Sequence, residues 1–328
     1  MLSQRTRPHR ATHGFTLVEL LVAMTLTLLV VLAATAMLTT ARQGFNTVDA
    51  ASQLRDNARL ATTIVQRIVD QGGFLDTGYA SSSRSSEFKV ANLLVNPEPA
   101  IRGYNDARYT DSRISASSNT NFDDGVNDSD MLAVRYQTGS SLPGTTTADS
   151  SMIDCSGTAS NLVAQDRYDR LVSVFYVAIS NTGEPALMCA SRNDAKGTFS
   201  SIPLVDGVET FQVLFGVDGV VANQAVSAAP DTVVDQYLRA DQLNVPGSSA
   251  EAIAATYANW QRVRSVRIGI VLRGPPGSAS ESKVPDQYPL GPSYASDKDA
   301  GSKIQKLNDG RLRQTVTFTM YLRNAQTP

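Results

Sequence analysis

Histidine is almost absent from this sequence. The only two, His9 and His13, lie within the first 14 of its 328 residues. Beyond them, no imidazole is available for a Ser-His-Asp triad or a His-ligated zinc site, and no potential nucleophile has a recognisable base. The G-x-x-x-x-G-K pattern of a phosphate loop is also missing. The sequence therefore predicts a protein that is not an enzyme and holds no cofactor and no catalytic metal.

Cysteine is equally scarce, with only Cys155 and Cys189. In an oxidising compartment two cysteines indicate one disulfide, whereas in a reducing compartment they indicate two buried thiols. A Cys155–Cys189 bond would close a loop of about 35 residues and contribute about 3–4 kcal/mol in the chain-entropy account. The choice between these alternatives depends on whether the domain is exported.

Neither sign of charge dominates: 29 Lys and Arg stand against 31 Asp and Glu, for a formal net charge of −2. Arg5, Arg7 and Arg10 precede Phe15, so a chain without them has 26 bases and a net charge of 26 − 31 = −5. Such a mildly acidic chain argues against direct binding of nucleic acid. The apolar content of 42% is that of an ordinary folded protein, and the chain is long enough for a sizeable core.

One long apolar run stands out, from Phe15 to Leu38, and Glu19 is its only charged residue. A helix needs roughly 20 apolar residues to span a membrane, and the basic residues before the run predict a cytoplasmic leader. An ordinary secretory signal has a shorter apolar core and a small-residue cleavage site after it, so it fits poorly. A carboxylate inside a membrane span costs about 2.5–3.5 kcal/mol and indicates a function.

The segment G-F-T-L-V-E-L, Gly14 to Leu20, resembles the class III signal of type IV pilins and type II secretion pseudopilins. The resemblance implies that prepilin peptidase cuts between Gly14 and Phe15, which makes residues 1–14 a leader, and that Phe15 becomes N-methylated. It also implies that Glu19 makes the assembly contact. Its carboxylate would neutralise the new terminal amine of a neighbouring subunit or of its own helix.

A second helical pattern follows the apolar run. Apolar residues recur at spacings of three and four, the mark of an amphipathic helix: Val48, Ala51, Leu54, Ala58, Ala61, Val65 and Ile68. We expect one helix from Phe15 to Gln71, ended by two glycines. Residues 15–38 would form its transmembrane and assembly part, residues 39–73 its amphipathic part, and residues 74–328 a periplasmic β-rich domain.

Strands are expected in the rest of the chain at 131–137, 170–180, 186–191, 208–217, 265–273 and 314–323, with a hairpin turn at 181–183 and a helix near 250–260. Residues 76–128, 226–262 and 274–310 are expected to be mainly loop. The last two strands alternate with period two, which predicts antiparallel sheet with one side buried. The expected fold class is α+β and pilin-like, with the long N-terminal helix packed on an antiparallel sheet.

Later segments narrow the resemblance. SDMLAVRY, LVDGVETFQVLFGVD, WQRVRSVRIGIVLR and FTMYLRN resemble, in this order, the PilW family of minor type IV pilins. The resemblance implies an inner-membrane protein with a periplasmic C-terminal domain that enters the pilus fibre and primes assembly at or near its tip. The implied partners are prepilin peptidase, other minor pilins, the major pilin, a PilY-type tip adhesin and inner-membrane lipid. A pseudopilin J-like tip subunit of type II secretion is the alternative, and a membrane-anchored periplasmic binding domain is the alternative of another class.

Some polar and aromatic clusters stay open to two interpretations. The carboxylates from Asp123 to Asp130 suit calcium by type but lack the D-x-[DN]-x-[DN]-G spacing, and a solvated turn explains them equally well. Three arginines before and in the 265–273 strand are expected to form a solvated or salt-bridged face: Arg262, Arg264 and Arg267. Tyr257 and Trp260 are expected in the core.

Overall fold

The computed structural model describes residues 14–76, 89–90, 93–94, 99–116, 120–142, 145, 147–161, 163–164, 169–193, 198–279, 284–305 and 307–324. The leader residues before Gly14, with their arginines and both histidines, lie outside the described part, as does much of the expected 76–128 loop. The chain divides into two compact units, Met1–Asp49 and Ala50–Pro328.

A single long helix, α1 (Leu17–Gln71), confirms the expected continuous helix to within two residues at its start. The part of α1 in the first unit, residues 17–49, is exposed. The part in the second unit, residues 50–71, contributes side chains to the core of that unit. The helix ends where expected, because Gly73 has a φ of +78°, a left-handed conformation that glycine adopts without steric cost.

The buried stripe of α1 starts later than its sequence pattern predicts. Val48 is 70% exposed, so its expected place on the packed face is wrong, and Ala51 is half-buried. The buried residues are Ala50, Leu54, Ala58, Ala61, Val65, Ile68 and Val69. The shift has a simple cause: the stripe can be buried only along the part of the helix that the sheet domain covers.

Two larger antiparallel sheets make up the rest of the second unit. The five-stranded sheet has the order β3-β4-β5-β6-β7, and the four-stranded sheet has the order β11-β10-β8-β9. The first comprises β3 (Ile101–Tyr104), β4 (Met131–Tyr136), β5 (Leu171–Ile179), β6 (Pro185–Asn193) and β7 (Thr198–Asp206). The second comprises β8 (Val208–Val217), β9 (Gln236–Leu238), β10 (Val263–Arg273) and β11 (Arg313–Tyr321). The strands β1 (Lys89–Val90) and β2 (Leu93–Leu94) form a separate two-stranded sheet.

Short helices fill the connections. These are α2 (Asp111–Ala116), η1 (Val126–Asp128), η2 (Ala240–Leu243), α3 (Ala250–Trp260), η3 (Pro292–Tyr294) and η4 (Ala300–Ser302). The side chain of Ser249 accepts a hydrogen bond from the backbone N–H of Ala252 and so caps α3, which matches the expected helix residue for residue.

All six expected strands are present, with ends shifted by up to two residues. The expected turn at 181–183 joins β5 to β6, and Gly183 has a φ of +80°. β3, β7 and β9 were not expected. β7 was missed because its residues are mostly exposed and lack clear alternation, as is common for a strand at the edge of a sheet.

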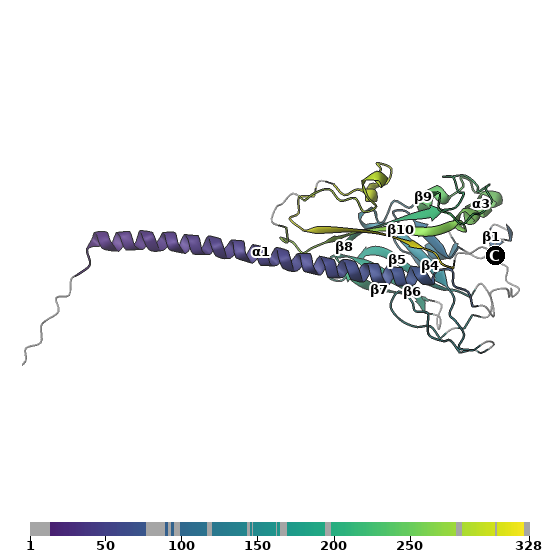
Figure 1. Ribbon diagram of the computed structural model, residues 1–328, viewed down its shortest axis with the longest axis horizontal. Coiled ribbons are helices and arrows are strands. Elements are labelled where there is room, and N and C mark those ends of the chain that lie inside the picture. Colours follow the sequence, from purple (N-terminus) through teal and green to yellow (C-terminus); the bar gives the residue numbers. More distant parts are fainter. Residues whose placement is uncertain are drawn as a thin grey trace, which may run out of the picture. The chain divides into compact units, whose positions relative to one another are not determined.

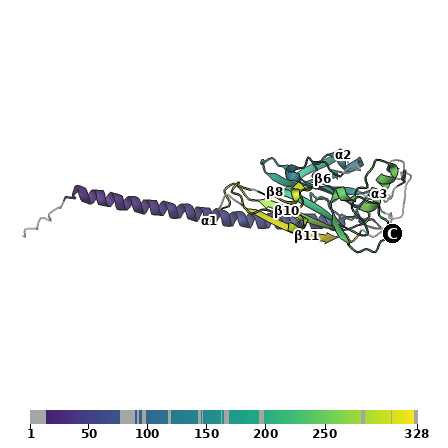
Figure 2. The same cartoon turned by 90° about the horizontal axis from the view of Figure 1, so that it is seen from above.

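The main core lies where the two sheets face each other and residues 50–71 of α1 run along them (Figure 1). β8 contacts β4, β5 and β6 of the other sheet and is buried along its whole length. Seen from above, β6, β8, β10 and β11 follow one another across the unit, with α2 and β11 on opposite sides (Figure 2). The predicted class, a long N-terminal helix with antiparallel sheet, is confirmed.

The 274–310 connection changes one expectation about β10. Its even-numbered residues, such as Ile268 and Ile270, are fully buried in the core, as predicted. The opposite face is also covered, because the connection crosses the strand at Gly269. A side chain there would place its Cβ 2.2 Å from the carbonyl oxygen of Pro289. β10 is therefore largely buried on both faces rather than on one.

Candidate assembly site and the clusters that hold the domain

The predicted assembly residues lie at the start of α1. Gly14 is surrounded by open space, because a Cβ added there would meet no atom within 4 Å outside its chain neighbours. Phe15 is 88% exposed. Thr16 and Glu19 cap the helix reciprocally. The Glu19 carboxylate accepts hydrogen bonds from the Thr16 backbone N–H at 3.0 Å and hydroxyl at 3.1 Å, and the Glu19 N–H donates to the Thr16 hydroxyl at 3.2 Å.

This arrangement is a capping box, which satisfies backbone donors that the first turn of a helix leaves free. The T-x-x-E spacing from Thr16 to Glu19 is visible in the sequence and is the signal that would have revealed it. Glu19 thus has a role within its own chain. Its Oε2 binds the backbone N–H of Thr16, the residue that follows Phe15, so the carboxylate lies close in sequence to the Gly14–Phe15 bond.

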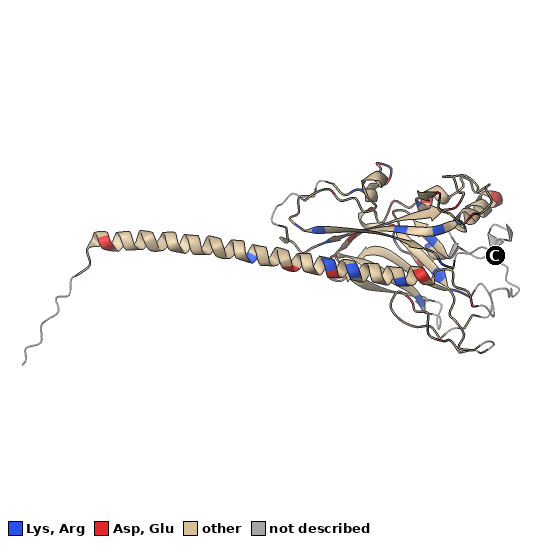
Figure 3. Cartoon of the chain, viewed as in Figure 1, with Lys and Arg blue, Asp and Glu red and all other residues tan. Residues whose placement is uncertain are grey.

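From Leu17 to Ala41, α1 presents an apolar surface around its circumference, with Glu19 as the exception. Leu17, Leu29 and Met37 are among side chains more than half exposed, and Figure 3 shows a long stretch of helix without charge. Among the described residues, α1 is the one helix long and apolar enough to cross a membrane, with a mean hydropathy of 2.5 in its most apolar window. Such a surface is stable only in lipid or against other apolar helices.

The hydroxyl groups in this segment are satisfied within the helix. Thr25 donates to the Val22 carbonyl at 2.9 Å, and Thr27 donates to the Ala23 carbonyl at 2.7 Å. Thr35, Thr39 and Thr40 make the same kind of bond. Because the helix itself accepts these hydrogen bonds, threonine adds little polarity to the surface, and Glu19 is the one charged group from Leu17 to Ala41.

Comparison with known families gives two matches. The family described as Type IV Pilus-assembly protein W matches residues 174–324, and the prokaryotic N-terminal methylation motif matches residues 9–35. The first match runs from within β5 to just beyond β11, and the second includes the capped start of α1.

The chain is a PilW-like minor pilin.

No curated protein matches the chain. Among solved structures, a type IV-like pilin from Thermus thermophilus is 11% identical, with 84% of this chain and 97% of that chain covered and a TM-score of 0.39. As a member of the type IV pilus machinery, the PilW-like protein is anchored in a membrane and interacts with other pilus components.

The PilW-like domain has a disulfide between Cys155 and Cys189, with Cα atoms 5.7 Å apart, which agrees with the one-bond alternative for the two cysteines. Cys189 lies on β6 and Cys155 in the connection before β5, and both are buried. The bond therefore fixes the connection before β5 to strand β6 of the five-stranded sheet. Gln71, the last residue of α1, exchanges hydrogen bonds with Ile153 close by.

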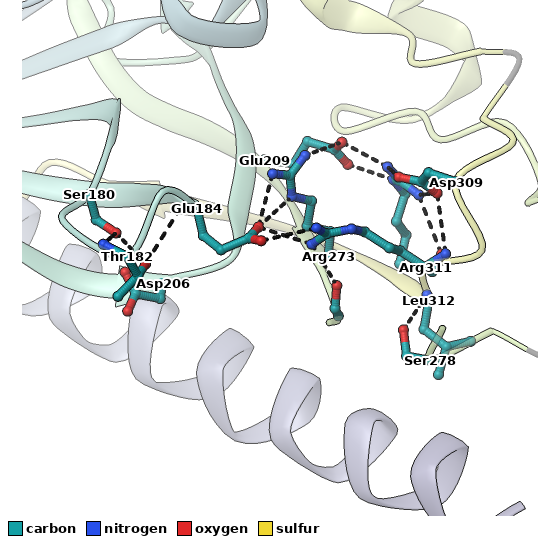
Figure 4. Close-up of polar contacts among 12 residues, drawn as sticks. Ser180, Thr182, Glu184, Asp206, Glu209, Arg273, Ser278, Asp309, Arg311 and Leu312 are labelled. Atoms are coloured by element: carbon teal, nitrogen blue, oxygen red, sulfur yellow. Dashed lines mark hydrogen bonds and ion pairs between the residues drawn. The ribbon is translucent and has the colours of Figure 1, made fainter. Parts of the chain in front are cut away.

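An ion-pair cluster holds the ends of several strands together (Figure 4). Glu184, in the β5–β6 turn, accepts from Arg273 at 2.9 Å and from Arg311 at 2.9 Å. Arg313 pairs with Glu209 on β8 at 2.5 Å and with Asp309 at 2.7 Å. Arginine suits this place because its planar group binds two carboxylates at once.

The cluster also affects the ionisation of its acids. Hydrogen bonds from Arg313 lower the pKa of Asp309 to about 2, although burial opposes the change. Hydrogen bonds from Arg311 and Arg273 lower the pKa of Glu184 in the same way. Because the Glu184 turn belongs to one sheet and Arg273 to the other, these charges join the two sheets at one end.

The Asp123–Asp130 segment is used to connect the sheets. Asp130 is buried and accepts hydrogen bonds from the backbone N–H groups of Asp106 at 3.1 Å and Val213 at 2.8 Å. Asp124 instead binds Arg113 at 2.8 Å. No group of three or more acidic, histidine or cysteine side chains in the described residues is placed to hold a metal ion. The segment forms a turn leading into β4, and its Asp124 and Asp130 carboxylates bind different protein partners.

The three arginines expected on one face have different environments. Arg264 and Arg262 both approach Asp218, at 3.0 and 3.6 Å, which is the salt-bridged alternative. Arg267 donates to the carbonyl of Leu290 at 3.1 Å instead. Tyr257 and Trp260 are buried as expected, and the ring of Trp260 packs edge-on against Phe215 with centroids 4.8 Å apart.

Proposed function

We propose that prepilin peptidase removes residues 1–14, that Phe15 becomes the N-methylated terminus, and that the mature chain primes pilus assembly at or near the fibre tip. The observation that carries this proposal is that the exposed Gly14–Phe15 bond directly precedes the capped start of α1, whose residues 17–41 are apolar apart from Glu19. A bond that precedes the helix is accessible to a peptidase, and cutting it leaves the capping box intact.

Cleavage creates a cation beside an apolar helix that carries one anion. The terminal amine of Phe15 and the carboxylate of Glu19 would each be costly in hydrocarbon, and pairing them removes much of both penalties. In its own chain the Glu19 carboxylate already accepts from Thr16, so its remaining oxygen lone pairs are free to accept the amine of an adjacent subunit. The packing of apolar helices then supplies the contact area.

Two substitutions at Glu19 separate charge pairing from helix capping. Glutamine at this position keeps an oxygen that can accept from Thr16 but has no charge, whereas alanine loses both. We expect leader removal to be largely normal in Glu19→Ala and Glu19→Gln, and entry into sheared fibres to fall at least tenfold in both. N-terminal mass spectrometry of the wild-type chain should find methyl-Phe15.

Other results would count against the proposal. Normal incorporation of Glu19→Gln with a defect only in Glu19→Ala would reduce Glu19 to a capping residue. An unprocessed N-terminus in the wild-type chain would exclude the cleavage step. Normal pili with a loss of type II secretion on deletion of the gene would assign the chain to a secretion pseudopilus.

A further inference from the structure

The outer face of the four-stranded sheet carries a small aromatic and cationic patch. Strand register places Thr319 directly opposite Arg267, and Tyr321 opposite Ser265 in the adjacent row. Tyr237 of β9 lies in the same row, across Gly216. Tyr294 of η3 completes the group. We call it the Arg267 patch, and it consists of Tyr237, Arg267, Tyr294, Thr319 and Tyr321.

The aromatic rings form a continuous support for the guanidinium. The centre of the Arg267 guanidinium lies 5.0 Å from the Tyr294 ring, which meets the Tyr237 ring edge-on with centroids 6.4 Å apart. The position of Tyr237 is fixed by Ser265 on β10, whose hydroxyl donates a hydrogen bond to the Tyr237 hydroxyl at 3.3 Å. These contacts fix the arginine in position before any ligand binds, which reduces the entropy lost on binding.

Arg267 differs from the other arginines of this sheet in having no carboxylate. Arg264, Arg273 and Arg313 each pair with Asp or Glu at 3.0 Å or less. Within the described part of the chain, no acidic oxygen lies within 4.0 Å of the Arg267 nitrogens, and its one hydrogen bond goes to the Leu290 carbonyl. Its Nε is buried and has no acceptor. A half-buried guanidinium in this state is incompletely neutralised and attracts an anion.

The residues around this cation are those that protein interfaces favour. Tyrosine and arginine are enriched at interface hot spots, and both bury large areas with little loss of conformational freedom. Tyr321 is 66% exposed although it lies on a strand, and Thr319 beside it is also exposed. β11 is the edge strand of its sheet, so nothing in the described residues pairs with its outer side.

We propose that the Arg267 patch binds an acidic side chain of a different pilus subunit, with the carboxylate on Arg267 and the surrounding surface on Tyr294 and Tyr321. The charge complementarity of the unpaired guanidinium identifies the ligand group, and the exposed tyrosine indicates a protein surface. This inference rests on the proposed function, because it names one contact that the subunit makes in the assembled complex.

The test uses the full chain in its own host. A photo-crosslinking phenylalanine analogue replaces Tyr321, cells are irradiated, and adducts are identified by mass spectrometry. We expect a crosslink to another pilus subunit in a peptide that contains Asp or Glu. Arg267→Glu should reduce this crosslink at least tenfold, since loss of a hot-spot arginine and addition of a like charge both oppose binding.

Arg192→Glu is the matched control, because Arg192 is exposed on β6 of the other sheet and undergoes the same charge change. It should leave the crosslink unchanged. A Cys155–Cys189 bond that forms normally shows that each variant is folded. Reversing the charge of the crosslinked acid in the other subunit should restore the Arg267→Glu crosslink.

Three results would overturn the contact. They are an undiminished crosslink in Arg267→Glu, an adduct between two copies of this chain, and an adduct with lipid alone. The proposed function fails separately: a chain absent from sheared fibres, but with an Arg267-dependent crosslink, would exclude a place in the fibre and keep this contact. A chain that enters fibres normally, but whose Tyr321 crosslink is undiminished in Arg267→Glu, would keep the fibre role and exclude the contact.

Discussion

The guanidinium of Arg264 on β10 binds the carboxylate of Asp218, just after β8, with Nη2 3.0 Å and Nε 3.1 Å from Oδ2. The two side chains are only 7% and 1% exposed. Asp218 also accepts hydrogen bonds from the backbone N–H groups of Asp231 and Thr232. One buried carboxylate thus holds both a neighbouring strand and the connection that leads to β9.

Removing the charge of Asp218 should strongly destabilise the domain. In Asp218→Asn the buried guanidinium of Arg264 loses its counter-ion, and breaking a buried pair from one side costs about 3–5 kcal/mol. The loss should appear as a lower denaturant midpoint for the full chain in detergent. Asp297→Asn is the control, because Asp297 pairs with Lys303 at the surface with 91% of its side chain exposed. An equal loss in both variants would contradict a special role for the buried pair.

Stability should rise on mild acidification because of Asp106. Burial raises the pKa of Asp106 to about 6, and neighbouring Asp123 and Asp128 add to the effect while a hydrogen bond from Gly125 opposes it. An unfolded aspartate has a pKa near 3.9, so between about pH 4 and 6 the folded chain binds more protons than the unfolded chain. Stability from this group therefore increases as pH falls through about 6.

Thermal unfolding from pH 7.5 to pH 5 measures this effect. Asp106→Asn should flatten the increase, by on the order of 1 kcal/mol once solvent screening is considered. Part of the increase should remain, because burial also raises the pKa of Asp130. Asp218 acts in the opposite direction at lower pH. Burial would raise its pKa, but hydrogen bonds from the groups around it, Asp231, Arg264 and Thr232, lower it overall. The stability that the ionised Asp218 contributes is therefore lost only as pH falls further. A profile unchanged by Asp106→Asn would be inconsistent with the raised pKa.

The disulfide should account for a measurable part of the domain's stability. Cys155 and Cys189 are 34 positions apart, and a closed loop of this size contributes about 3–4 kcal/mol in the chain-entropy account. Replacing both cysteines by alanine should lower the free energy of unfolding by that amount and make the midpoint insensitive to reductant. Denatured wild-type protein should show no free thiol before reduction and two afterwards, and two free thiols before reduction would contradict the bond.

Local sequence patterns were sufficient to predict a helix or strand where neighbouring residues in the chain determine its ends and its buried face. β11 alternates because one of its faces lies against the core, and α3 begins at its serine cap and ends as expected. β7 escaped notice because an edge strand exposes most of its residues, so no alternation marks it. Val48 has the right spacing for the α1 stripe and is still exposed, since periodicity does not indicate how far along a helix the domain extends.

The amino-acid sequence alone determined the long helix, its single charged residue Glu19, the preceding Gly14–Phe15 bond and most of the strands, because each depends on neighbouring residues in the chain. Only the tertiary structure decided which distant charges meet. Arg264 and Arg267 are three positions apart, yet the register of β8 and the path of the following connection bring Asp218 to Arg264, while the 284–305 segment brings only Tyr294 and the Leu290 carbonyl to Arg267. Charge pairing depends on contacts between segments far apart in sequence, and no local pattern encodes them.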